Sequence, residues 1–151
     1  MSAVVGNKVP LMAMVKADAY GHGMIKAAEA FAGAGCRIFG VAELCEGVVL
    51  RQAGIAGEIF VTLGIPEEDR GLIFTYNLTP VIYSYETAQA LSRSALALGK
   101  TLDVHIKVDT GMTRLGVLPG DMPGFLDSIS SMKGLQIAGV MSHFPGADDP
   151  D

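Results

Sequence analysis

Apolar runs alternate with amphipathic stretches along this 151-residue chain, and this alternation limits its fold more than any other feature. Six short apolar runs have the composition of buried strands, and they begin about 20 to 33 residues apart, the spacing of βα units. Without antiparallel signals, the pattern predicts an α/β fold with about six parallel strands. The predicted strands are Leu11–Val15, Arg37–Ala42, Glu58–Leu63, Leu78–Tyr83, Leu102–Val108 and Leu135–Met141.

Between these runs, apolar residues recur at the spacing of a helix. Proline suits the first position of a helix, and a serine hydroxyl can accept a hydrogen bond from the first turn. Acidic residues suit the positive end of a helix, which favours a start at Pro66. The predicted helices are Met24–Ala34, Glu43–Ala53, one that Pro66 begins, one that Ser84 caps, and Met122–Met132.

Composition excludes several classes of protein. Half of the residues are apolar and 18% are charged, which suits strands buried on both faces. The net charge of −5 argues against nucleic acid as a partner. The longest apolar runs reach about seven residues, too few to span a membrane, and the N-terminus lacks the features of a signal peptide. Cys36 and Cys45 have no metal-binding spacing, so we expect free thiols in a cytoplasmic protein and no metal site.

Two architectures fit repeated βα units, a doubly wound open sheet and a (β/α)8 barrel. A dinucleotide-binding sheet carries Gly-x-Gly-x-x-Gly after a strand, and Gly21-x-Gly23 alone is a weak match. Six strands are too few to close a barrel. No linker or charge block divides the chain, which predicts one domain over residues 1–151.

The stretch Leu11–Gly23, LMAMVKADAYGHG, predicts a buried strand, a tight turn and the start of a helix. Lys16 follows the strand directly. A lysine at a strand end can simply extend its ammonium into solvent. In a partly desolvated pocket, however, the pKa of a lysine falls, and the free amine can form a Schiff base with a carbonyl.

Other polar residues also follow predicted strands, at the end where parallel α/β folds build their active sites. Each has an ordinary alternative, such as a cap, an ion pair or a loop histidine, but together they favour a site. The turn at Asp109 offers amides to an anion, and Arg114 can grip a carboxylate. Nearby cations would need an anion, supplied by a phosphorylated cofactor or a carboxylate substrate. The residues at or directly after the ends of predicted strands are Lys16, Glu43, Lys107, Asp109, Ser142 and His143.

Three segments resemble the signatures of bacterial alanine racemases, in the same order and at matching separations. They are VKADAYGHG at residues 15–23, HIKVDTGMTRLG at residues 105–116 and SHFPGAD at residues 142–148. The resemblance extends over essentially the whole chain. It implies a (β/α)8 barrel of the TIM type, followed by a β-rich C-terminal domain, in a homodimer that racemises alanine for the bacterial cell wall.

The resemblance also implies roles for individual residues. Lys16 would bind pyridoxal 5′-phosphate covalently and act as one of two catalytic bases. Tyr20 would hydrogen-bond the cofactor phosphate, and Arg114 would contact the cofactor's phenolic oxygen and the substrate carboxylate. Lys107 matches a lysine that is often carbamylated, which turns a cation into an anion. His143 would lie beside the cofactor.

Two departures from the family pattern are visible. Thr113 stands where the family commonly has glycine, and because a β-branched residue disfavours positive φ, we expect a slightly different loop. The family's first strand and helix, last strands and β domain have no counterpart in this sequence. That domain carries the tyrosine that serves as second base, so we expect a partial barrel that is inactive alone.

Three alternatives remain open at this stage. The parent protein could racemise another small amino acid. The chain could resemble the single-domain barrels that bind pyridoxal phosphate without turnover. It could also be a fragment without a function of its own.

Overall fold

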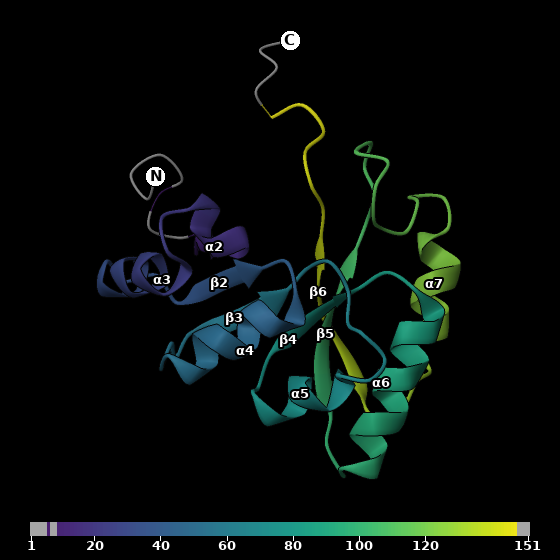
Figure 1. Ribbon diagram of the computed structural model, residues 1–151. Helices are drawn as coiled ribbons and strands as arrows, with labels where there is room; N and C mark the ends of the chain where they lie inside the picture. Colours follow the sequence, from purple (N-terminus) through teal and green to yellow (C-terminus); the bar gives the residue numbers. More distant parts are fainter. Residues whose placement is uncertain (1–5, 7–8, 148–151) are drawn as a thin grey trace. The chain divides into compact units, whose positions relative to one another are not determined.

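The computed structural model describes Gly6 and residues 9–147 (Figure 1). The chain divides into two compact units, residues 1–79 and residues 80–151. Each unit is described by itself. The described residues form six strands, β1 to β6, and six helices, α2 to α7.

The first unit contains three parallel strands in chain order. The central strand β2 pairs with β1 on one side, Ala13 opposite Phe39, and with β3 on the other, Phe39 opposite Ile59. Phe39 and Ile59 are completely buried, as the apolar composition predicts for strands covered on both faces. The elements are β1 (Met12–Met14), α2 (Lys16–Tyr20), α3 (Met24–Gly33), β2 (Ile38–Val41), α4 (Leu44–Gln52), β3 (Glu58–Val61) and α5 (Arg70–Thr75).

The second unit has the same alternation. Strand β5 pairs in parallel with β4 and with β6. The register of β5 against β6 shifts between Val104 and His105, so that His105 lies opposite Gly139. A Cβ on Gly139 would lie 2.6 Å from Cε1 of His105, so any larger residue there would require the imidazole to move. The elements are β4 (Thr79–Ile82), α6 (Tyr85–Ala97), β5 (Leu102–Lys107), α7 (Met122–Ser130) and β6 (Leu135–Met141).

All six predicted strands are confirmed, and five of them are one or two residues shorter than the apolar runs. Several of the residues that flank the strands are apolar because they cover the core, whether or not they take part in strand pairing. Val15 illustrates this, since it is completely buried but lies outside β1.

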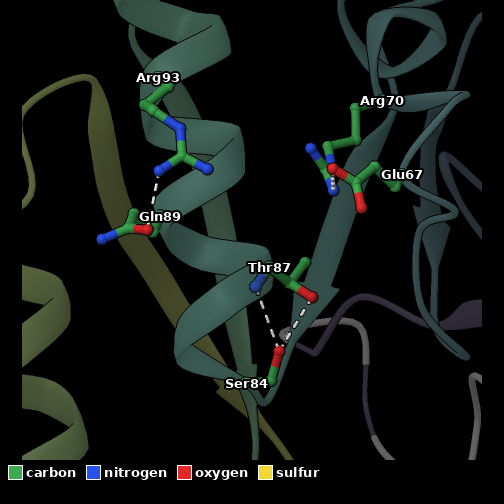
Figure 2. A network of polar contacts seen from close by, with 6 residues as sticks. All are labelled: Glu67, Arg70, Ser84, Thr87, Gln89 and Arg93. Atoms are coloured by element: carbon green, nitrogen blue, oxygen red, sulfur yellow. Dashed lines mark hydrogen bonds and ion pairs between the residues drawn. The ribbon is translucent and has the colours of Figure 1, made fainter.

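The helix predicted to begin at Pro66 is wrong at its start, because α5 begins at Arg70. Residues 67–69 form a turn in which the amide of Asp69 donates to the carbonyl of Pro66 at 3.3 Å. The fixed φ of proline suits turns as well as helix starts. Figure 2 shows Glu67 turned toward Arg70, with an ion pair of 3.3 Å between them. The acidic run therefore lies in an exposed turn before the helix.

Ser84 caps α6 as predicted. Its Oγ accepts a hydrogen bond from the amide of Thr87 at 3.2 Å and donates to the Thr87 hydroxyl at 2.9 Å (Figure 2). One turn further along α6, Arg93 donates to Gln89 at 2.7 Å. The Ser84 cap, two residues after β4 ends, fixes the start of α6.

Among the described residues, no helix is both long enough and apolar enough to cross a bilayer. Over the same residues, no three His, Cys, Asp or Glu side chains are grouped so that they could hold a metal ion.

Candidate functional site

Lys16 lies at the carboxyl end of β1, between two anchored neighbours. The amide of Val15 donates to the carbonyl of Gly40 at 2.9 Å, which extends the pairing of β1 with β2. Val15 is completely buried, whereas the Lys16 side chain is half-buried and reaches solvent. The tight turn predicted after this lysine is confirmed.

The turn after Lys16, which carries the label α2 in Figure 1, is left-handed and not a regular α-helix. Four consecutive residues, Ala17 to Tyr20, have φ between 51° and 53°. A left-handed residue other than glycine costs roughly 1–2 kcal/mol, so this conformation needs specific support. The sequence predicted a turn, but alanine and tyrosine gave no signal of its hand.

Backbone hydrogen bonds support the left-handed turn. The amide of Ala19 donates to the carbonyl of Val15 at 3.0 Å. The carbonyl of Asp18 accepts from Gly21 at 3.1 Å and from Gly23 at 3.0 Å, and both glycines have positive φ. The glycines of the YGHG sequence therefore complete a turn that other residues would strain further.

Two side chains lock the same turn to the helix that follows. The Asp18 carboxylate accepts a hydrogen bond from the amide of Met24 at 2.7 Å, at the first residue of α3. His22 donates from Nδ1 to the carbonyl of Ala19 at 2.8 Å. This bond gives His22 a structural role. Tyr20 is 69% exposed, so its hydroxyl is accessible beside the turn.

Glu46 also contacts this turn, and the sequence did not single it out. Its carboxylate accepts a hydrogen bond from the amide of Ala17 at 2.6 Å. Glu46 is the third residue of α4, a position where an acid commonly accepts a hydrogen bond from the start of the helix. That position was the one sequence signal that could have drawn attention to Glu46. The neighbouring Glu43, which was predicted to face the site, is exposed at the N-cap of α4.

In the second unit, Asp109 organises the loop that follows β5. Its carboxylate accepts hydrogen bonds from the amides of Thr113 at 2.9 Å, Gly111 at 3.0 Å and Arg114 at 3.1 Å. The Thr113 and Gly111 amides together hold the pKa of Asp109 below its usual value. The prediction that these amides face an external anion is wrong for Gly111, because Asp109 itself supplies the anion.

Thr113 corrects a second prediction. It has a φ of 54°, so the loop keeps the conformation that glycine favours although a β-branched residue occupies it. The amide bond to Asp109 and a 3.3 Å bond from the Thr113 hydroxyl to the carbonyl of Gly111 hold it there. The premise of the expected difference in this loop, that a β-branched residue disfavours positive φ, therefore does not hold at Thr113.

The loops after β5 and β6 meet. The hydroxyls of Thr110 and Ser142 share a hydrogen bond of 2.5 Å, and Thr110 also donates to the carbonyl of His143 at 3.4 Å. The second and third signature segments, predicted from the sequence as separate elements of a site, are thus joined at the carboxyl ends of β5 and β6.

The predicted site residues of this unit differ in exposure. Lys107, the last residue of β5, is buried, with 7% of its surface exposed. Arg114 and His143 are both exposed, in the loops that follow β5 and β6. The side chains of Arg114 and His143 can therefore reach a small molecule that binds at this end of the strands.

Each unit by itself offers groups that can bind a small molecule. A half-buried lysine amine can attack an aldehyde, and the exposed hydroxyl of Tyr20 can bond a phosphate oxygen. Arg114 offers a planar donor fork for an oxygen anion. Lys16 and Tyr20 belong to the first unit and Arg114 to the second.

Parallel βα units with polar residues at the carboxyl ends of the strands define a parallel α/β protein. The chain belongs to the alanine racemase N-terminal domain family, whose model matches residues 1–151.

Individual relatives agree with this assignment. The chain is 42% identical over 148 residues to the alanine racemase of Halothermothrix orenii. This match covers 98% of this chain and 39% of that protein. It is 44% identical over 149 residues to the alanine racemase of Synechocystis, covering 97% of this chain and 40% of that protein. The chain thus spans about two fifths of the length of these relatives.

Solved structures agree as well. The alanine racemase of Clostridium difficile matches with a TM-score of 0.92 at 31% identity, covering 98% of this chain and 39% of that one. The alanine racemase of Bacillus anthracis with bound L-Ala-P matches with a TM-score of 0.88 at 31% identity, covering 99% of this chain and 39% of that one. The barrel class predicted from the sequence is confirmed.

Proposed function

We propose that this chain is the greater part of the barrel domain of a pyridoxal-phosphate-dependent alanine racemase, which interconverts L- and D-alanine. The observation that carries the proposal is Lys16, accessible at the carboxyl end of β1 and followed by a left-handed turn. Membership of the alanine racemase family and relatives of that name support the same reaction.

Pyridoxal phosphate, when bound, supplies a conjugated ring that delocalises the negative charge left when the substrate Cα loses its proton. Lys16 holds the cofactor through its amine, and the Tyr20 hydroxyl binds the phosphate. Arg114 binds oxygen anions of the cofactor and of the substrate carboxylate. His143 would lie beside the cofactor.

Lys16 is also the base for one face of the substrate. Its Nζ takes the Cα proton from one enantiomer of alanine and returns a proton to the same face for the reverse reaction. Inversion requires a second group on the opposite face. None of the three signature segments supplies that group, so racemisation depends on residues outside them.

Lys107 carries a carbamate in the assembled site. The ammonium first loses a proton, the neutral Nζ then attacks carbon dioxide, an N–C bond forms as one C–O π bond opens to an oxygen anion, and a second proton leaves the nitrogen, so that a cation becomes an anion. The match of Lys107 to the lysine that is often carbamylated in the family supports this proposal. Carbon-13 NMR in labelled bicarbonate would detect the carbamate, and Lys107→Ala should abolish that signal.

The whole protein acts as a homodimer on alanine in the cytoplasm. Cys36 and Cys45 are both free thiols, as expected in a reducing compartment. Cross-linking of the protein expressed from its complete reading frame tests the dimer.

Covalent labelling tests the cofactor assignment. Added pyridoxal phosphate should produce a visible absorbance band, and borohydride should fix the label on Lys16. Lys16→Arg keeps the positive charge without a nucleophilic amine, so it should lose the band and retain the fold. Peptide mapping that finds the label mainly on Lys26 or Lys100 would contradict the assignment.

A racemisation assay tests the reaction itself. The complete reading frame should racemise alanine, and Lys16→Arg should reduce turnover by several orders of magnitude. Labelling of Lys16 without turnover would instead indicate a non-catalytic cofactor-binding protein. Turnover of a different small amino acid in preference to alanine would correct the substrate.

A further inference from the structure

The two carboxylate oxygens of Glu46 bond different parts of the first unit. Oε2 accepts hydrogen bonds from the amides of Ala42 at 2.8 Å and Glu43 at 3.0 Å. Oε1 accepts a hydrogen bond from the amide of Ala17 at 2.6 Å. One carboxylate therefore joins the end of β2, the start of α4 and the turn that follows Lys16.

Only the Oε2 contacts belong to the capping of α4. An acid at the third position of a helix commonly returns a hydrogen bond to the amide of the N-cap residue, here Glu43. Capping gives no reason for a bond to Ala17, which lies 29 residues away in the sequence. The Oε1 contact therefore serves the turn after Lys16.

The position of Ala17 shows what this contact achieves. Val15, the residue before Lys16, is completely buried, and its amide donates to the carbonyl of Gly40. With Ala17 bonded to Glu46, the backbone of Lys16 is fixed on both sides. Hydrogen bonds to a carboxylate are stronger than those between neutral groups, and Ala17 has an unfavourable φ of 52° that such a bond can maintain.

We infer that Glu46 is a positioning residue for Lys16, holding its backbone so that the amine reaches the cofactor in one orientation. This inference rests on the proposed function, in which Lys16 binds pyridoxal phosphate covalently. Glu46 acts through the backbone of Ala17 and is not itself a catalytic residue.

Glu46→Gln separates the two roles of the carboxylate. The single carbonyl oxygen of glutamine can still accept from Ala42 and Glu43, which preserves the cap. Its amide nitrogen then faces the amide of Ala17, donor against donor. The variant should remove the contact that positions Lys16 and leave α4 folded.

Arg51 provides the matched control, because it lies in the last turn of the same helix. Its guanidinium donates to the carbonyls of Ile55 at 2.6 Å, Asn77 at 2.8 Å, Tyr76 at 2.9 Å and Gly57 at 3.0 Å. Arg51→Lys should lower the stability of the unit without affecting Lys16. Comparing both variants separates positioning from a general loss of stability.

The experiment measures the rate at which pyridoxal phosphate labels Lys16, fixed with borohydride and followed by peptide mapping. Glu46→Gln should slow labelling of Lys16 about tenfold and leave labelling of Lys26 and Lys100 unchanged. Arg51→Lys should lower the urea midpoint and leave labelling of Lys16 unchanged. Equal labelling of Lys16 in the wild type and Glu46→Gln would overturn the inference, as would equal slowing in both variants.

Amide hydrogen exchange gives a readout that needs neither cofactor nor variant. Ala17 is exposed, so slow exchange of its amide in the wild type would reflect the bond to Glu46. Rapid exchange would overturn the inference even if Glu46→Gln fails to fold. If the wild type shows slow exchange of the Ala17 amide but no labelling of Lys16, the proposed function is overturned instead. The role of Glu46 toward the cofactor is then overturned with it.

Discussion

The hydroxyls of Thr110 and Ser142 lie 2.5 Å apart and join the loops that follow β5 and β6. These residues come from two different signature segments, 32 positions apart in the sequence. The carboxyl ends of adjacent parallel strands meet at one edge of a sheet, which is why segments so distant in sequence come into contact.

A double-mutant cycle tests this contact. Thr110→Val and Ser142→Ala each remove one hydroxyl, and each should lower the free energy of unfolding by about 1 kcal/mol. The double variant should lose less than the sum, because the bond can be lost only once. Urea denaturation of the four proteins measures the coupling, and strictly additive losses would contradict the contact.

The carboxylate of Asp109 should make the loop after β5 sensitive to acid. The amides of Thr113 and Gly111 lower its pKa in the folded state relative to the unfolded value of 3.8. Such a group stabilises the fold above its unfolded pKa, and the contribution is lost as the pH falls through the lower, folded pKa. Asp109→Asn should therefore reduce stability at pH 7, and the difference from the wild type should shrink in acid.

Asp127→Asn is the control for this pH dependence. Asp127 is exposed on α7, and no backbone amide of the described residues donates to its carboxylate. Urea midpoints measured between pH 7 and pH 2 should therefore differ little between this variant and the wild type. A pH-independent difference between Asp109→Asn and the wild type would contradict the lowered pKa.

Gly116 should tolerate no side chain. Its φ is 139°, and an added Cβ would clash with the amide nitrogen of Asp109 and lie 2.7 Å from the carbonyl carbon of Val108. Gly116→Ala should therefore lower the free energy of unfolding by roughly 2–4 kcal/mol. Gly120→Ala, where an added Cβ meets nothing within 4 Å, should stay within about 0.5 kcal/mol of the wild type.

The order of strands and the location of Lys16 were predictable from the sequence because they depend on periodicity and on the chemistry of single residues. Buried strands such as β2 need an apolar run, and a cation directly after such a run is visible at once. The bend at Pro66 was not predictable in the same way, since proline and acidic residues suit both a turn and a helix start.

The contacts that support the turn after Lys16 could not be predicted from the sequence either. Glu46 bonds Ala17 only because β1 and β2 are paired, and no local pattern encodes a contact over 29 residues. The left-handed turn was equally hidden, since Ala17 and Tyr20 carry no preference for positive φ. Tertiary hydrogen bonds determine both features, and those become visible once the strands are in register.

Thr113 gives the last prediction, because it maintains a φ of 54° against its intrinsic preference. Thr113→Gly removes the steric cost of the left-handed region, roughly 1–2 kcal/mol, and increases the entropy lost on folding by a smaller amount. The variant also loses the 3.3 Å bond from the threonine hydroxyl to Gly111, which is exposed and weak. We expect a net gain in the free energy of unfolding of about 0.5–1 kcal/mol. Thr101→Gly, at an exposed residue that precedes β5 and lacks positive φ, should instead destabilise by a similar amount. Thermal denaturation of both variants measures the difference, and a loss of stability in Thr113→Gly equal to that in Thr101→Gly would mean that the loop does not strain Thr113.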